Sequence, residues 1–232
     1  MKKRTAIIAA LVSLMSVGQP VTIVTGVFLS SVGLILTVPN QSKAESIDFL
    51  YERGNSRQES GDFYGALSDF TRIIETNPRD AGAYYNRGNA KSDLEDYYGA
   101  IADYTKAIEL DPDDADFYYN RGNVKSDLED YYGAISDFNK AIEINPMYSG
   151  AYYNRGTVKG RNLGDNYGAI ADFTKAIEID PSNTSSYVNR GITKEKLGDM
   201  KGACSDWRKA YSLEVEEGLD VSSYEELTKE CE

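Results

Sequence analysis

Histidine is absent from the 232 residues of the sequence, and cysteine occurs only twice. Histidine is the commonest general base and the commonest metal ligand, so its absence removes every Ser-His or Cys-His nucleophile pair. The sequence also contains no CxxC pair, no glycine-rich phosphate loop and no calcium-loop pattern. These absences predict that the protein is not an enzyme and holds no metal and no cofactor.

Positive charge is also scarce, since the net charge is −12. The first 44 residues hold four basic residues (Lys2, Lys3, Arg4 and Lys43) and no acidic one. The remaining residues contain 21 basic and 37 acidic side chains, a net charge of −16. Such a surface repels phosphate backbones, so nucleic acid is not an expected partner.

Residues 1–44 differ from the rest of the chain. A basic start is followed by an apolar stretch that breaks at Pro20 and resumes from Val21 to Val38. Small residues at Ser42 and Ala44 complete the pattern of a secretory signal cleaved after Ala44. The second apolar run has 18 residues, close to a membrane span, so a retained N-terminal anchor and a hairpin broken at Pro20 are alternatives. The first two interpretations place the protein outside the cytoplasm, in a periplasm or equivalent lumen, with or without membrane anchoring, and the hairpin does not.

The sequence is rich in tyrosine, with 18 residues, and it repeats. Glycine recurs at a spacing of 34 residues, then 35, at Gly54, Gly88, Gly122, Gly156 and Gly191. A small residue and an aromatic residue keep step with it: Ala66, Ala100, Ala134, Ala169 and Ala203, and Phe70, Tyr104, Phe138, Phe173 and Trp207. Self-similarity at this period indicates stacked helix-turn-helix units.

These motifs resemble the tetratricopeptide repeat (TPR) family, in the style of bacterial and notably cyanobacterial members. The resemblance implies an all-α fold, a right-handed α-solenoid of five helix-turn-helix units. The units are residues 47–80, 81–114, 115–148, 149–183 and 184–217. Residues 218–232 are expected to form a C-terminal capping helix. The extra residue of unit four falls between Gly156 and Gly164, where we expect a lengthened or bulged first helix or turn.

The two cysteines lie near the start of the last repeat helix, at Cys204, and at the end of the expected capping helix, at Cys231. An antiparallel capping helix brings its end back toward Cys204. In an exported protein this placement favours a disulfide. Two unrelated thiols are the alternative.

The family resemblance implies a concave face lined by the first helix of each unit. Helical periodicity puts positions 5, 6 and 9 of each unit on one face. In this chain those positions carry Tyr85, Asn86, Asn89, Tyr119, Asn120, Asn123, Tyr153, Asn154 and Asn189. An asparagine amide can pair with both the N–H and the C=O of a peptide, and tyrosine adds flat contact area. The pattern predicts a peptide-binding groove, with an unused solvated face as the alternative.

The carboxylate-clamp variant of the family uses Lys and Arg at positions 2, 5 and 6, and this sequence lacks them. Asp93 and Asp127 make the central groove acidic instead, so we expect a neutral or basic peptide. The sequence thus predicts an exported scaffold or adaptor that binds a protein or extended peptide. The alternative is a self-associating envelope protein or a membrane-anchored assembly factor.

One further regularity pairs opposite charges. Every unit has Arg at position 7 and, on its second helix, Asp: Arg53 with Asp69, Arg87 with Asp103, Arg121 with Asp137, Arg155 with Asp172, and Arg190 with Asp206. Guanidinium and carboxylate suit a bidentate bond, so we expect ion pairs within a unit or between neighbours. Contact of the Arg ladder with a ligand is the alternative.

Overall fold

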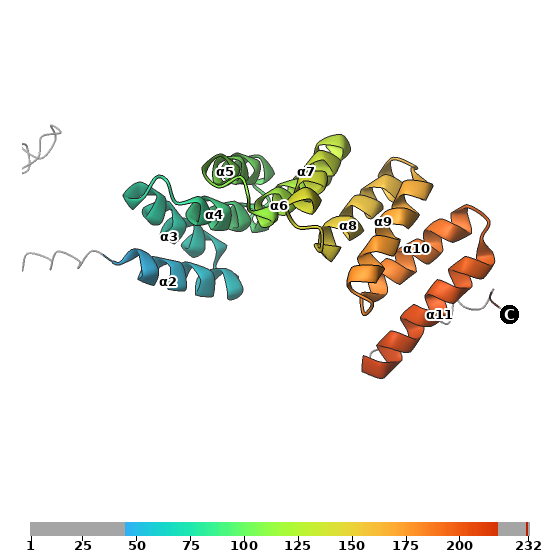
Figure 1. Ribbon diagram of the computed structural model, residues 1–232. Coiled ribbons are helices and arrows are strands. Elements are labelled where there is room, and N and C mark those ends of the chain that lie inside the picture. Colours follow the sequence, from blue (N-terminus) through green and yellow to red (C-terminus); the bar gives the residue numbers. More distant parts are fainter. Residues whose placement is uncertain (1–44, 218–230, 232) are drawn as a thin grey trace, which may run out of the picture. The chain divides into compact units, whose positions relative to one another are not determined.

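The computed structural model describes residues 45–217 and residue 231 (Figure 1). Within these residues every regular element is a helix, and successive helices pair as helix-turn-helix units, which confirms the predicted all-α solenoid. The first helices are α2 (Ile47–Glu59), α4 (Ala81–Asp93), α6 (Ala115–Asp127), α8 (Ser149–Thr157) with η2 (Val158–Asn162), and α10 (Thr184–Lys196). The second helices are α3 (Phe63–Thr76), α5 (Tyr97–Leu110), α7 (Tyr131–Ile144), α9 (Asn166–Ile179) and α11 (Met200–Glu217).

A shared capping motif starts the second helices. The side chain of Asp130 accepts a hydrogen bond from the backbone N–H of Gly133 at 3.1 Å, and the other units repeat this bond. The carboxylate satisfies a backbone donor that has no partner inside the helix. A Cβ at Gly133 would lie 2.0 Å from that carboxylate, which explains why the third residue after the aspartate is glycine.

Close packing inside each unit depends on the glycine of the first helix. A Cβ at Gly122 would lie 2.8 Å from the ring of Phe138 on the second helix, and the same contact recurs in the other four units. The ring is fully buried together with Ala134. The recurring glycine, alanine and aromatic residue therefore form one contact, in which the ring lies directly on the backbone of the partner helix.

Unit four contains the expected bulge. Its first helix changes at Val158 from α8 into the π-helix η2, which absorbs the additional residue. A wider turn of this kind is the usual result of a one-residue insertion in a helix. Gly160 permits it, because a Cβ there would lie 2.8 Å from the side chain of Ala169.

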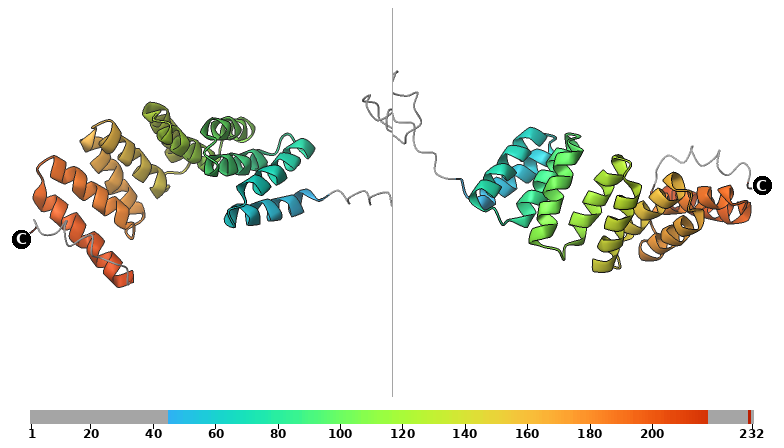
Figure 2. Two further views of the ribbon diagram at one scale, coloured as in Figure 1. Left: turned by 180° about the vertical axis from the view of Figure 1, so that it is seen from behind. Right: turned by 90° about the horizontal axis from the view of Figure 1, so that it is seen from above.

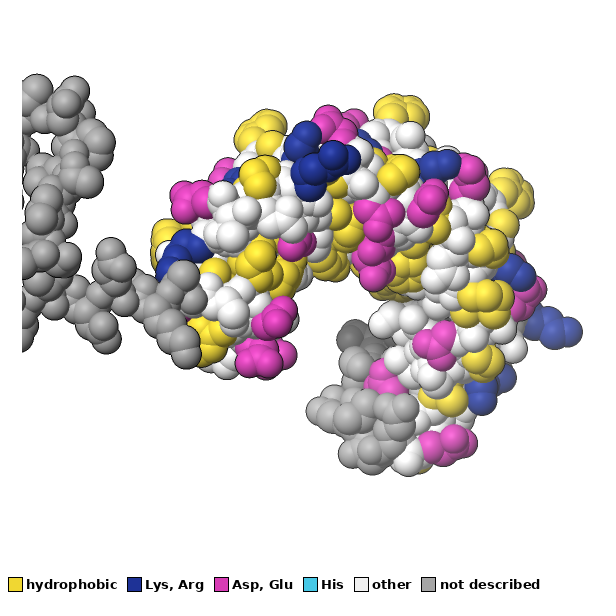
Figure 3. All heavy atoms as spheres, turned by 60° about the vertical axis from the view of Figure 1, so that its left-hand side comes forward, with side chains coloured by type: hydrophobic (Ala, Val, Ile, Leu, Met, Phe, Trp, Pro, Cys, Tyr) yellow, Lys and Arg dark blue, Asp and Glu magenta, His cyan; other side chains and the backbone are white. Residues whose placement is uncertain are grey.

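Neighbouring units stack on one another in order. Each first helix packs on the second helix of the preceding unit, and α2 also contacts α4, as α4 contacts α6 (Figures 1 and 2). Contacts between successive first helices place those helices on the inner side of the stack. Figure 3 shows that the stack of five repeats is hollowed on one side.

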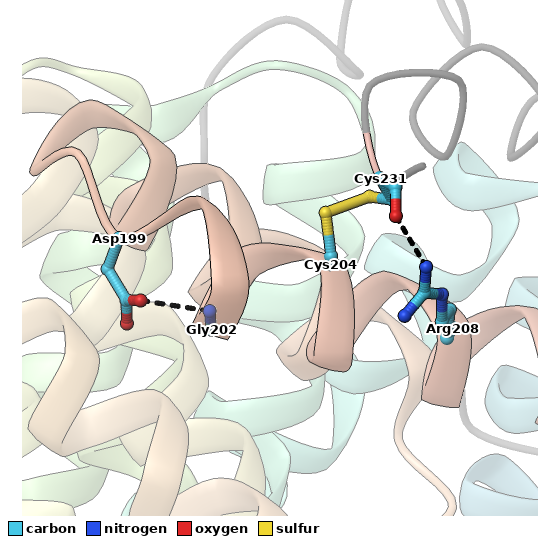
Figure 4. The surroundings of a disulfide bond; sticks show 5 residues. All are labelled: Asp199, Gly202, Cys204, Arg208 and Cys231. Atoms are coloured by element: carbon cyan, nitrogen blue, oxygen red, sulfur yellow. Dashed lines mark hydrogen bonds between the residues drawn. A yellow bond between two sulfur atoms is a disulfide. The ribbon is translucent and has the colours of Figure 1, made fainter.

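A disulfide lies at the C-terminal end of the repeats. It joins Cys204, in the first half of α11, to Cys231, whose Cα lies 5.5 Å away (Figure 4). Arg208 donates a hydrogen bond to the carbonyl oxygen of Cys231 at 2.6 Å. The capping helix predicted for residues 218–232 lies outside the described residues apart from this cysteine, and the N-terminal segment 1–44 lies outside them entirely. No helix among the described residues is long and apolar enough to cross a membrane.

Candidate functional site

The tyrosines and asparagines of the predicted groove are joined by hydrogen bonds between units. The amide Nδ2 of Asn120 donates to the hydroxyl oxygen of Tyr85 at 2.7 Å. Asn154 donates to Tyr119 at 3.0 Å, and Asn189 donates to Tyr153 at 2.8 Å. All six side chains are half-buried. These three Tyr–Asn hydrogen bonds, which we call the ladder, link neighbouring first helices. Sequence reasoning missed this structural role.

The tyrosine rings of this ladder are held from both sides. The ring of Tyr85 lies 5.9 Å from that of Tyr104 in its own unit and 5.0 Å from that of Phe117 in the next. A tyrosine hydroxyl is protonated at neutral pH, and burial raises the pKa of Tyr85 further. A hydroxyl that accepts the bond from Asn120 keeps its own hydrogen for an acceptor in the groove.

The other predicted residues face the same side of the molecule. Asn89 accepts a hydrogen bond from the Tyr104 hydroxyl at 2.7 Å, and Asn123 accepts one from Asn154 at 2.7 Å. Asn86 makes no side-chain hydrogen bond to a described residue. Its amide is therefore open to a ligand, whereas the other ladder amides are partly used.

A row of pockets lies between successive first helices, and we call this row the groove. The groove has four pockets. From the N-terminal end, the first is lined by Asn55, Gln58, Glu59, Asn86 and Asn89, and the second by Gln58, Tyr85, Asn89, Ser92, Asp93, Tyr104 and Asn120. The third is lined by Asn123, Ser126, Asp127, Phe138, Asn154, Thr157 and Val158, and the fourth by Thr157, Gly160, Arg161, Phe173, Asn189, Ile192, Thr193 and Lys196. Tyr119 and Tyr153 reach the groove through Asn154 and Asn189. The structure thus places seven of the nine predicted residues in the groove and the other two, Tyr119 and Tyr153, in hydrogen-bond contact with it.

The predicted Arg–Asp pairs form within units. Arg121 donates from Nε and Nη2 to the two carboxylate oxygens of Asp137, at 2.9 and 2.7 Å, and the other four units repeat the bidentate bond. The Asp137 side chain is only 5% exposed. A third member was missed: Lys125, one turn after the arginine, approaches the same carboxylate at 2.7 Å. Arg57, Lys91, Lys159 and Lys194 occupy this place in the other units.

The same arginines also connect units. Arg121 donates from Nη1 to the hydroxyl of Thr105, on the second helix of the preceding unit, at 3.0 Å. Its guanidinium carbon also lies 5.7 Å from the centre of the Tyr118 ring. With three of its five N–H donors engaged within the protein, the arginine has a structural role.

Within the described part of the chain no unit precedes unit one, and Glu45 takes that place. Arg53 donates to both carboxylate oxygens of Glu45, at 2.7 and 3.0 Å, while it also binds Asp69. Arg72 also pairs with Glu45. The hydrogen bond from Arg53 keeps the pKa of Glu45 below its usual range. Burial alone would raise the pKa of Asp69, but the bonds from Arg53 and Arg57 bring it below its usual range.

Within the described residues, no group of Cys, Asp and Glu side chains is placed to hold a metal ion. Stacked helix pairs, each held together by the same ion-pair cluster and presenting a row of pockets between first helices, define a class, the α-solenoid scaffolds for protein interaction. One family model for the TPR repeat matches residues 89–128, and two models for the tetratricopeptide repeat match residues 115–148 and 149–183. Over the matched residues 89–183 the chain therefore consists of tetratricopeptide repeats.

Solved structures of similar fold extend over most of the chain. A crystal structure of MamA is 26% identical, with a TM-score of 0.66, and the match covers 74% of this chain and 93% of that one. YrrB, described as a TPR protein with an unusual peptide-binding site, is 25% identical with a TM-score of 0.59, covering 72% and 84%. MamA of Desulfovibrio magneticus RS-1, at 21% identity, a TM-score of 0.67 and coverage of 73% and 96%, shows the fold alone. No curated protein matches the chain.

Proposed function

We propose that this protein is an exported scaffold that holds an extended segment of a partner protein in the groove. One observation carries the proposal: polar amides and hydroxyls line a row of pockets between successive first helices, on the inner side of the stack. An extended peptide has unpaired N–H and C=O groups along its length, and asparagine amides can pair with both. YrrB, which has the same fold, has a peptide-binding site, and this supports the proposal.

The hydrogen bonds between units favour binding rather than preventing it. The Asn120 amide donates one hydrogen to Tyr85, and its second N–H and its carbonyl oxygen remain available for a peptide. Because that bond fixes the orientation of the amide, less side-chain entropy is lost when a peptide arrives. The ladder therefore serves both to set the spacing of the units and to present ordered amides.

Export is the second half of the proposal. Its support is the signal-like sequence of residues 1–44 and the bond between Cys204 and Cys231, since disulfides persist in oxidising compartments. The acidic groove residues Asp93 and Asp127 favour a neutral or basic partner. Self-association through the N-terminal end is less favoured, because Glu45 already pairs with the arginine that a neighbouring unit would meet.

The experiment is site-specific photo-crosslinking in the native host. A crosslinking residue placed at Asn86 or Ser126, both in the groove, should capture a partner protein. The control positions are Tyr98 and Tyr132 on second helices, each 78% exposed. Asn86→Ala should reduce capture from Ser126 without changing the fold, because no described hydrogen bond is lost. Equal capture from groove and control positions would contradict the proposal.

A further inference from the structure

We propose that the groove selects a peptide whose charges are separated, with a basic stretch over units one to three and an acidic stretch over units four and five. The inference rests on the proposed function and deepens it. It identifies the charge pattern of the bound segment from charged groove side chains, which are not required for hydrogen bonding to the peptide backbone.

Five charged residues lie at equivalent places along the groove. Each lies two positions after the second basic residue of an ion-pair cluster, that is after Arg57, Lys91, Lys125, Lys159 or Lys194, and each is exposed. In chain order they are Glu59, Asp93, Asp127, Arg161 and Lys196, and each lines a groove pocket. The sign of the charge therefore changes once, between units three and four. Figure 3 shows acidic side chains facing the hollow of the stack.

The architecture does not account for this change of sign. All five units, including unit four with its π-helix, form the same ion-pair cluster, whichever charge this position carries. Among the described residues, Glu59, Asp127, Arg161 and Lys196 form no ion pair, and Asp93 only accepts a hydrogen bond from Gln58 at 3.2 Å. On the second helices, by contrast, Lys106, Lys140 and Lys175 each pair with a glutamate three residues on. The groove charges thus remain available to a partner.

The surroundings strengthen both halves. The pocket partly desolvates the Asp127 carboxylate, which raises its pKa, and an opposite charge from a partner would offset that desolvation. Arg161 lies within the π-helix, where the wider turn and the absence of a side chain at Gly160 leave a pocket that both line. The sign therefore changes at the bulge of unit four. An extended segment with a single kind of charge would meet repulsion in one half of the groove.

The test uses three labelled peptides of identical composition. One has a lysine-rich half followed by a glutamate-rich half, the second has the halves in reverse order, and the third alternates the two residues. Binding to the processed protein is measured by fluorescence anisotropy. At least one block peptide should bind about tenfold more tightly than the alternating one, because several weak exposed pairs add up. The advantage should shrink at high salt.

The variant R161E with K196E makes the groove acidic throughout. It should lose the preference for the block peptide and instead bind a lysine-only peptide most tightly. The matched control is K201E with K209E, which makes the same change of charge at exposed positions of α11. Thermal melting shows that each variant folds.

The outcomes separate the two proposals. If the wild-type protein binds block and alternating peptides equally, or if R161E with K196E keeps the block preference, the inference fails while the groove remains a peptide site. If no peptide binds and no partner crosslinks at Asn86 or Ser126, the proposed function fails as well.

Discussion

Removing one carboxylate from an Arg–Asp–Lys cluster should destabilise the protein far more than removing one from a turn. Asp137 in unit three accepts two bonds from Arg121 and one from Lys125, all between 2.7 and 2.9 Å. The side chains of the three residues are 5%, 16% and 20% exposed. In Asp137→Ala, two partly buried cations would lose the only acidic group that pairs with them in the described part of the chain.

The expected cost follows from these contacts. Removing one member of a buried pair typically costs about 3–5 kcal/mol, and the partial exposure of the two cations places the estimate near the lower end, at about 3 kcal/mol. Asp113→Ala, in the exposed turn between units two and three, should cost about 0.5 kcal/mol or less. The two substitutions remove the same side chain from the same central part of the array.

Urea titration followed by circular dichroism gives the free energy of unfolding for each variant. Since repeat arrays can unfold in parts, hydrogen exchange of residues 115–148 supplies a local measurement. Asp137→Ala should speed exchange in α6 and α7 before it affects α10. Combining it with Arg121→Leu should recover part of the loss, because one uncompensated charge is then removed as well.

Equal midpoints for Asp137→Ala and Asp113→Ala would refute the structural role of the cluster. A double variant that is less stable by the sum of its single losses would also refute it, since the two residues would then act independently.

Two further predictions concern packing and the disulfide. Gly122→Ala should lower the free energy of unfolding by about 1–3 kcal/mol, because its Cβ would lie 2.8 Å from the Phe138 ring, and urea titration should show a smaller loss in a Phe138→Leu background. Reduction of the Cys204–Cys231 bond, which closes a loop of 27 residues, should cost about 3–4 kcal/mol in the chain-entropy model. Mass spectrometry after alkylation without reductant should find no modified cysteine, and two modified cysteines would contradict the bond.

Periodicity was sufficient to predict the helix pairs, because the recurring glycine, alanine and aromatic residue encode one contact between helices. The bulge followed from a single extra residue between Gly156 and Gly164. The third member of each ion cluster did not follow, since Lys125 and its equivalents resemble ordinary surface charges. Glu45 was also missed, because it lies before the first repeat and has no counterpart in the period.

The hydrogen bonds of the groove could not be predicted from position alone. Helical periodicity shows that Tyr85 and Asn120 each face the groove, but whether hydroxyl and amide meet depends on the rotation between successive units. That rotation results from the packing of whole helices. The sequence therefore predicted the residues of the site without the contacts that orient them.

Tyr51 and Asn86, which occupy the first position of the ladder, show that free amide groups are not evenly spread along the groove. The hydroxyl of Tyr51 donates to Asp80, the N-cap of α4, at 2.5 Å. By position, the partner of Tyr51 would be Asn86, just as Asn120 is the partner of Tyr85. No hydrogen bond between Tyr51 and Asn86 forms, so the Asn86 amide stays open, next to the acidic residue Glu59 in the same pocket. A basic segment that enters the groove at units one and two thus meets an unshared amide and an unpaired carboxylate together.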